Sequence, residues 1–158
     1  MEFNQIANDI ITHEKYQALA YEDHHGLSRY EHSIRVAKTT YKITKALGLD
    51  YKSATRAALL HDFYTNEDLK EKNKINRLRT HPEMALENAR NYFGVNDIEA
   101  NAIRTHMFPL TFNLPTSKEA AIVNMADNVV AIYECSRYKL QSVLTLWMLF
   151  VFNVITYR

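Results

Sequence analysis

Glycine and proline are scarce in this sequence, with three residues of each type among 158. Together these two residue types usually make up about 12% of a protein, and most tight β-turns need them. The chain therefore lacks the turn residues that a fold of many short strands requires. We predict an all-α protein, a compact bundle of about six to seven helices.

Cysteine is rare as well, and neither sign of charge dominates. The single cysteine, Cys135, excludes an internal disulfide and a cysteine-based zinc site, and it fits a reducing compartment. Nineteen Lys and Arg residues against eighteen Asp and Glu give a net charge of +1, so no bulk basic surface attracts nucleic acid. No basic and apolar segment near Met1 resembles a signal peptide. We therefore expect a cytoplasmic protein with no nucleic-acid partner.

Short polar residues mark the expected helix starts, several of them with a Glu three positions later as in a capping box. These residues are Ser28, Asp50, Thr80, Asn96 and Thr116. Gly48 and Gly94 follow apolar residues and are suited to ending helices. The predicted helices span residues 2–20, 28–47, 51–62, 80–93, 96–107 and 116–134, followed by a last helix. We interpret residues 63–79 as a charged loop with one short helix at most.

The C-terminal segment differs in hydropathy from the rest of the chain. Residues 140–157 contain no charged side chain and are apolar on every side of a helical wheel. A helix of this length spans about 27 Å, just short of a bilayer core, and the basic residues Arg137 and Lys139 precede it. We predict a domain of residues 1–135 and an apolar helix of residues 136–158. Three alternatives stay open for this helix: packing on the domain, a homodimer interface, or a tail at the inner face of the membrane.

The residues with the most distinctive chemistry are histidines and aspartates near helix ends. The six candidates are His32, His61, Asp62, His81, His106 and Asp127. Imidazole and carboxylate groups together form a mixed nitrogen and oxygen donor set, which suits iron, manganese, cobalt, nickel or zinc. We therefore predict that these residues hold one or two divalent transition-metal ions.

Five segments around these residues follow one order along the chain. They are YEHSIRVA at 30–37, AALLHDFY at 57–64, THPEMALENA at 80–89, AIRTHMFP at 102–109 and MADNVVAIYE at 125–134. This H…HD…H…H…D order resembles the HD-domain superfamily of metal-dependent phosphohydrolases, and the resemblance covers residues 16–135. It is similar in particular to the binuclear branch that includes bacterial dinucleoside-tetraphosphate hydrolases.

The resemblance implies a function and a role for each candidate. The first metal would be held by His32, His61, Asp62 and Asp127. A second metal would be held by His81 and His106, with Asp62 bridging both and a bridging water as the nucleophile. The implied activity is hydrolysis of a phosphoester or phosphoanhydride in a small nucleotide or dinucleotide.

Residues that contact the phosphate or the leaving group are less clear from the motifs. Arg35 lies one helical turn after His32, where its guanidinium either binds a phosphate or forms a surface ion pair. Thr65 stands where many family members carry a lysine, so the general acid is unassigned. We take Asp62 and Arg35 as catalytic candidates, and Arg35, His25 and Lys74 as substrate-binding candidates. The missing lysine keeps an alternative open, a non-catalytic module that binds a nucleotide or a partner.

Overall fold

Helices account for most of the chain. The computed structural model describes residues 2–24, 27–68 and 73–156. Its elements in chain order are α1 (Glu2–Ile11), α2 (Glu14–Gln17), the 3-10 helix η1 (Ala18–Tyr21), β1 (Asp23–His24), β2 (Leu27–Ser28), α3 (Arg29–Ala46), α4 (Tyr51–Leu60), α5 (Lys74–Phe93), α6 (Asp97–Thr105) and α7 (Lys118–Thr156). The two short strands pair antiparallel. The predicted all-α class is confirmed.

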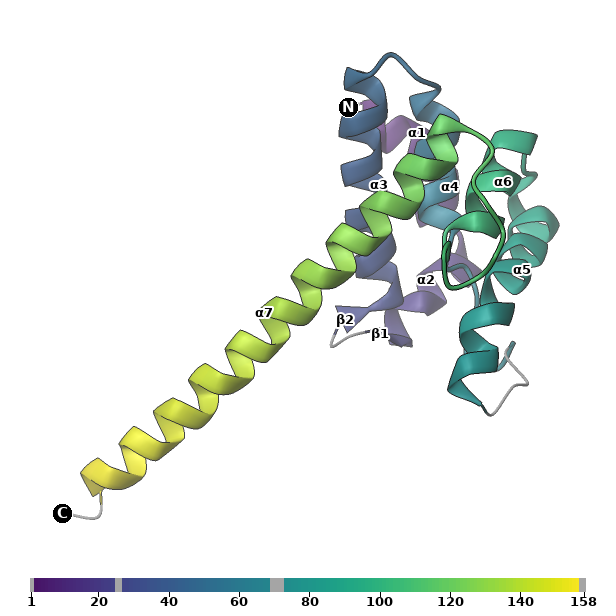
Figure 1. Cartoon of the computed structure of the whole chain (residues 1–158). Helices are drawn as coiled ribbons and strands as arrows, with labels where there is room; N and C mark the ends of the chain where they lie inside the picture. The colour runs from purple at the N-terminus through teal and green to yellow at the C-terminus, as the bar shows by residue number, and fades with distance from the viewer. Residues whose placement is uncertain (1, 25–26, 69–72, 157–158) are drawn as a thin grey trace.

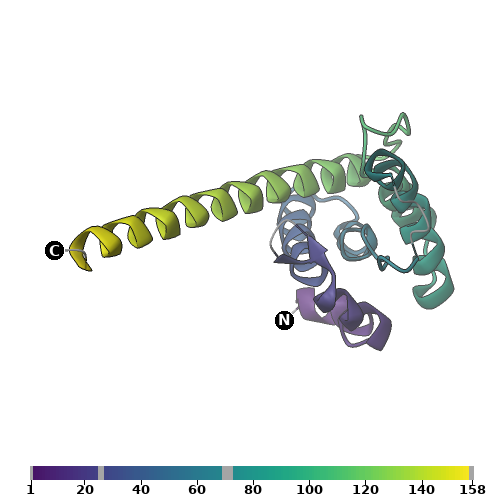
Figure 2. The same ribbon diagram turned by 90° about the horizontal axis from the view of Figure 1, so that it is seen from below.

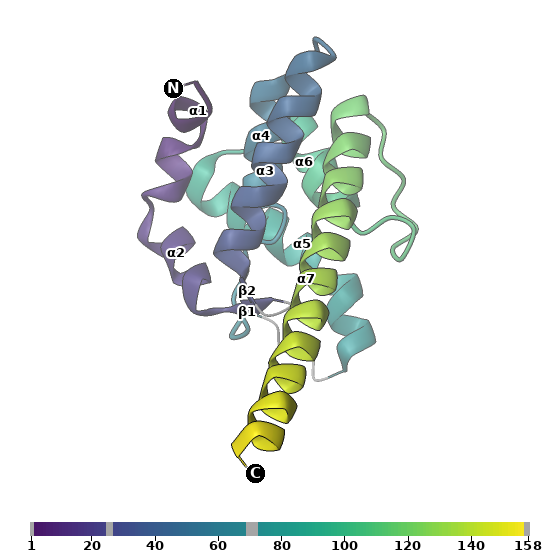
Figure 3. The same ribbon diagram turned by 90° about the vertical axis from the view of Figure 1, so that its left-hand side faces the viewer.

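Helix α4 lies at the centre of the bundle. It packs against α1, α3, α6 and α7, and in Figure 3 α3 and α7 run side by side in front of it. Seven of its ten residues are buried, and the small residues Ala54, Ala57 and Ala58 let the neighbouring helices approach closely. Because α4 is central, His61 and Asp62, which follow its last residue, lie in the interior of the molecule.

Three of the predicted helix starts are confirmed by their capping bonds. The Ser28 side chain accepts a hydrogen bond from the backbone N–H of Glu31, and Asp50 accepts one from that of Ser53. Asn96 and Glu99 form a reciprocal capping box at the start of α6. Each bond satisfies a backbone donor that the first helical turn leaves unpaired. Local polar chemistry therefore sets where α3, α4 and α6 begin.

The predicted N-terminal helix over residues 2–20 is interrupted. Helix α1 ends at Ile11, and the ring of His13 accepts a hydrogen bond from the N–H of Lys15 to begin α2. The apolar spacing continues across the break because Tyr16 and Leu19 are buried in the same core as Ile10. Periodicity alone therefore did not reveal the turn.

The prediction that a helix starts at Thr80 is wrong. Helix α5 begins six residues earlier, where the Asn73 side chain accepts a hydrogen bond from the N–H of Ile75. Thr80 lies inside the helix, and its hydroxyl donates to the carbonyl of Asn76, 2.9 Å away. A threonine hydroxyl forms this bond in a helix interior as readily as it caps a helix start.

The predicted end of a helix at residue 134 is also wrong, because α7 is one continuous helix from Lys118 to Thr156. At its start, Ser117 rather than Thr116 accepts a hydrogen bond, from the N–H of Ala120. Figures 1 and 2 show that the N-terminal half of α7 lies on the bundle and that its C-terminal half projects away from it. Leu140, Met148 and Leu149 are exposed there.

The hydropathy of this helix bears on the membrane alternative. Among the described residues, no helix is both long and apolar enough to cross a membrane.

Candidate metal centre

The structure brings all six predicted metal-ligating residues together from five helices. They are His32 in α3, His61 and Asp62 at the end of α4, His81 in α5, His106 at the end of α6, and Asp127 in α7. The four imidazoles and Asp62 are buried, and Asp127 is nearly so. Ionisable groups are this deeply buried only where they are paired or bind an ion.

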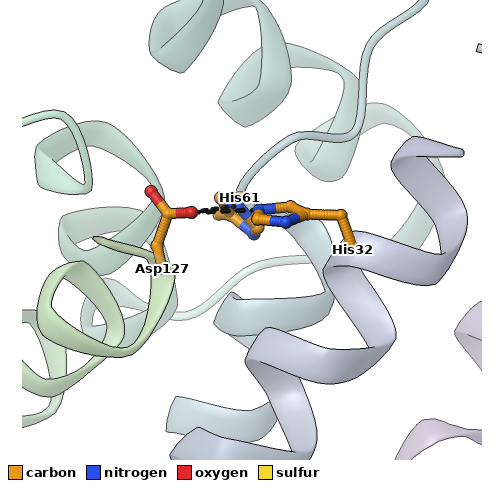
Figure 4. A group of neighbouring side chains, drawn as sticks. All are labelled: His32, His61 and Asp127. Carbon is orange, nitrogen blue, oxygen red and sulfur yellow. Dashed lines mark hydrogen bonds and ion pairs between the residues drawn. The ribbon is translucent and has the colours of Figure 1, made fainter. Parts of the chain in front are cut away.

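Two overlapping groups of donor atoms lie at this centre. One consists of His32, His61 and Asp127, and the other of His61, Asp62 and His106, with the donor atoms of each group within 4.8 Å of one another. Figure 4 shows the first group, in which the carboxylate of Asp127 points from α7 towards the rings of His32 and His61. Nε2 of His32 is 3.0 Å from Oδ1 of Asp127, and Nε2 of His61 is 3.6 Å from the same oxygen.

Asp62 belongs to the second group and presents one oxygen to His61 and the other to His81 and His106. Its Oδ2 is 3.8 Å from Nε2 of His61. Its Oδ1 is 3.4 Å from Nε2 of His81 and 3.6 Å from Nε2 of His106. A carboxylate with one oxygen on each side is suited to bridge two cations.

The backbone fixes the orientation of three imidazoles. Nδ1 of His61, His81 and His106 lies 2.8, 3.0 and 2.7 Å from a helical carbonyl oxygen. A carbonyl only accepts, so each Nδ1 carries the proton and each Nε2 directs its lone pair towards the centre. A second hydrogen bond of this kind is the usual way in which proteins orient metal-binding histidines.

These lone pairs make a cation a good fit for the centre. Nε2 of His81 and Nε2 of His106 are only 3.0 Å apart, and two lone pairs at this distance repel unless a positive charge lies between them. Nε2 of His61 is buried and has no hydrogen-bond partner among the described residues. Nitrogen and carboxylate donors turned inwards in this way match the preferences of divalent transition metals.

The pKa values of the histidines differ across the centre. Burial, together with the neighbouring His61 and His81, lowers the pKa of His106 to about 3. Burial also lowers the pKa of His81. For His32, the effect of burial is outweighed by hydrogen bonds with the carboxylates of Asp127 and Glu134, which raise its pKa to about 10. The His81 and His106 side is thus made of neutral imidazoles, the form that binds metals.

Glu134 is a functional candidate that the sequence analysis missed. Its carboxylate is only 3% exposed, and its Oε2 accepts a hydrogen bond from Nδ1 of His32 at 2.8 Å. This carboxylate replaces the backbone carbonyl that orients each of the other three imidazoles. Glu134 follows Asp127 by two helical turns, so both carboxylates lie on the same face of α7. That spacing was a signal in the sequence.

The other predicted site residues lie outside this cluster. Nη1 of Arg35 is 3.6 Å from Oε1 of Glu134, and its side chain is partly exposed. Its predicted contact with a phosphate group stays a prediction. Thr65 donates a hydrogen bond to the carboxylate of Asp68. His25 and the side chain of Lys74 lie outside what the structure describes.

A cavity of about 270 Å³ opens beside the centre. The cluster residues on its wall are Asp62, His81, His106 and Asp127. The rest of its lining includes Tyr64, Leu78, the loop residues 107–110, and Asn128 and Ala131 of α7. A molecule in this cavity therefore meets the side of the centre that carries His81 and His106.

An all-α bundle with buried imidazoles and carboxylates around one centre defines a helical protein with side chains that could hold a metal. The model of the HD domain family matches residues 29–132, and the chain belongs to this family. The predicted superfamily is thereby confirmed.

Similar curated proteins are ribonucleases Y. The chain is 33% identical to the one from Mycoplasma mycoides over 120 residues, which are 76% of this chain and 26% of the relative. It is 33% identical over 113 residues to that of Mesoplasma florum, covering 72% of this chain and 20% of the relative. For Lactobacillus gasseri the values are 39% over 88 residues, 56% of this chain and 15% of the relative.

The chain thus spans about a quarter or less of the length of these relatives. They support the superfamily but not the narrower resemblance to dinucleoside-tetraphosphate hydrolases. No solved structure matches the chain significantly.

Proposed function

We propose that this chain is a metal-dependent phosphohydrolase that cleaves phosphodiester bonds, with RNA as its substrate class. The proposal rests on the convergence of imidazole and carboxylate side chains at the wall of one cavity. The choice of RNA is supported by the similarity to proteins named ribonuclease Y. Our expectation of no nucleic-acid partner rested on the net charge of +1, which does not describe the local field at one face.

The chain's own residues define how metal ions would be held. We assign one ion to His32, His61, Asp62 and Asp127, and a second to His81, His106 and Asp62. Asp62 is suited to serve both because one of its oxygens lies near His61 and the other near His81 and His106. Divalent ions there would supply Lewis acidity, which lowers the pKa of water and stabilises charge on phosphoryl oxygens.

The protein contributes orientation and proton control. Glu134 and the helical carbonyls hold the Nδ1 protons, which keeps every Nε2 directed at the centre. The buried positions of His32 and His61 exclude bulk water from the inner side. Thr65 is bonded to Asp68 and is not placed to protonate a leaving group. Arg35 is proposed to contribute positive charge at the outer edge, where it adjoins Glu134.

A small nucleotide is the second candidate substrate, and the size of the cavity favours it. At about 270 Å³ the cavity is slightly smaller than typical ligand pockets, which measure about 300–1,000 Å³. It therefore accommodates one compact group rather than a long stretch of a nucleic acid. An RNA strand would place only one of its nucleotides inside the cavity.

The test compares substrates under matched metal supply. Purified protein with manganese, iron or cobalt is incubated with an end-labelled oligoribonucleotide, mononucleotides or dinucleoside polyphosphates. We expect cleavage of the oligoribonucleotide, a loss of turnover by orders of magnitude in Asp62→Asn, and full turnover in the surface control Asp97→Asn. In labelled water, one solvent oxygen should appear on the phosphorus of a product.

Two outcomes would contradict the proposal. If the phosphate groups of the products carried no oxygen from the labelled water, water would not be the nucleophile. Binding of the oligoribonucleotide or a nucleotide without turnover, under all three metals, would select the non-catalytic binding module instead.

A further inference from the structure

The cavity beside the metal centre is asymmetric in its chemistry. Part of the lining, the first wall, consists of the carboxylates and imidazoles of the centre. The second part, the apolar wall, consists of Leu78, Met107, Phe108, Pro109, Leu110 and Ala131. A phosphate group is suited only to the first wall, because an apolar surface offers it no hydrogen bonds and no charge. The part of a ligand that packs on the apolar wall is therefore uncharged and largely apolar.

Hydrogen bonds hold the apolar wall in place. The side-chain amide of Asn124 donates to the carbonyls of His106 and Phe108, the latter at 2.7 Å. The N–H of Thr111 donates to the carbonyl of Met107 at 3.0 Å, which closes the turn that carries Phe108 and Leu110. A wall fixed in this way needs little reorganisation when a ligand binds.

One polar side chain completes the cavity. The amide of Asn128 lines it, and its Nδ2 donates to the carbonyl of Asn124 at 2.8 Å, which orients the group. A side-chain amide carries both donors and an acceptor, which are the groups that pair with the edge of a nucleobase. A planar base with polar edges thus matches both the apolar wall and Asn128.

We infer that this cavity binds the nucleoside on one side of the scissile phosphate, so that the substrate is a diester with an uncharged group there and not a polyphosphate. The inference deepens the proposed function and rests on it. The volume of about 270 Å³ sets the scale, since it suits a single nucleoside rather than a dinucleoside polyphosphate.

Leu110 offers a variant with a matched control. Its side chain is 62% exposed and lines the cavity, whereas Leu114 on the same loop is 63% exposed and does not line it. Both can be changed to serine with little effect on the core. Thermal unfolding and metal content should therefore be the same for Leu110→Ser, Leu114→Ser and the parent chain.

The kinetic arm compares three diesters that have the same single charge. The first is the dinucleotide ApA. The second is the methyl ester of adenosine 3′-phosphate, which keeps only the 5′ nucleoside of ApA, and the third is the methyl ester of adenosine 5′-phosphate, which keeps only the 3′ nucleoside. For the parent chain, kcat/KM of one methyl ester should be about tenfold below that of ApA, because it lacks the nucleoside that the cavity binds. Leu110→Ser should close most of this gap by lowering kcat/KM for ApA, and Leu114→Ser should keep it.

An equilibrium arm separates this inference from the proposed function. ApA with a methylphosphonate linkage, which resists hydrolysis, is titrated into each metal-loaded protein by calorimetry. Weaker binding to Leu110→Ser than to Leu114→Ser supports the cavity even if no diester is hydrolysed, a result that would sink the proposed function alone. Equal binding to both variants, equal kcat/KM for all three diesters, or faster hydrolysis of a dinucleoside tetraphosphate than of ApA overturns the inference.

Discussion

The carboxylate of Glu134 and the ring of His32 form a buried hydrogen bond of 2.8 Å, which links α7 to the metal centre. His32 uses its other nitrogen, Nε2, to contact Asp127 at 3.0 Å. The ring is thus clamped between two carboxylates of one helix. Glu134 is therefore a positioning residue for His32, and it sets the direction of the nitrogen that would bind the metal.

Replacing Glu134 tests this relationship. In Glu134→Gln, the side chain keeps its shape but no longer carries the charge that stabilises the proton on Nδ1 of His32. Loss of such a partner usually lowers metal affinity about 10–100-fold, and we expect a loss in this range by competitive metal titration. Glu87→Gln, at an exposed position of α5, is the control. An unchanged metal affinity in Glu134→Gln would contradict the positioning role.

Metal removal should also lower the stability of the fold. An ion that binds only the folded chain stabilises it by about 2.7 kcal/mol at a concentration 100 times its Kd. We therefore expect the melting temperature to rise with added manganese, to fall with a chelator, and not to respond to either in Asp62→Asn. Asp97→Asn should respond as the parent chain does. A metal-dependent rise that persists in Asp62→Asn would place the ion elsewhere.

Local features of the sequence predicted α3, α4 and α6 well. Their starts are set by side chains within three residues, such as Ser28 with Glu31 and Asn96 with Glu99, so no distant contact is needed. The start of α5 could not be predicted in this way, because Thr80 has two competing uses, capping and bonding to the preceding turn. The continuity of α7 had a signal, since residues 118–156 contain no glycine or proline.

The metal-ligating residues of the candidate site could be predicted from the sequence, whereas Glu134 and the apolar wall of the cavity could not. The order of the histidines and aspartates located the six residues that the fold brings together. Glu134 was missed because its role depends on a pairing with His32 across 102 positions of the chain. The apolar wall at Phe108 and Leu110 was missed for a similar reason, since exposed apolar residues in a loop have no sequence pattern that marks a cavity.

Arg29 provides a test of how the segment after Asp62 is held. Its side chain is 4% exposed, donates to the carbonyl of Tyr64 at 2.6 Å and lies 4.0 Å from the centre of that ring. It also pairs with Glu22 at 3.5 Å. Removing one partner of a buried polar contact costs about 1–3 kcal/mol, so Arg29→Met should lower the free energy of unfolding by this amount.

The lysine variant separates charge from geometry at this position. Arg29→Lys keeps the charge but loses the planar fork that bonds the carbonyl and stacks on Tyr64. We expect an intermediate loss in urea unfolding, with no loss for Arg90→Met at an exposed position. If Arg29→Lys were as stable as the parent chain, the charge alone would account for the contact.

The acid sensitivity of the fold should depend on Glu2. Hydrogen bonds from Lys45, Tyr51 and Tyr41 lower the pKa of the Glu2 carboxyl from 4.5 to about 2. These bonds tie α1 to α3 and α4, with Tyr51 at 2.7 Å and Tyr41 at 2.9 Å. A carboxyl with a lowered pKa in the folded chain stabilises that chain above its unfolded pKa, and this stability is lost as the pH falls through the folded value.

The contribution of Glu2 should therefore be complete above about pH 4.5 and disappear towards pH 2. Free energies of unfolding in urea, measured across this range for the parent chain and Glu2→Gln, should converge at low pH because glutamine does not titrate. Other acidic groups titrate in the same window, so the difference between the two curves isolates Glu2. Glu14→Gln, exposed at the start of α2, is the control and should follow the parent chain. A difference between parent and Glu2→Gln that does not change with pH would show that the hydrogen bonds do not depend on the charge of the carboxylate.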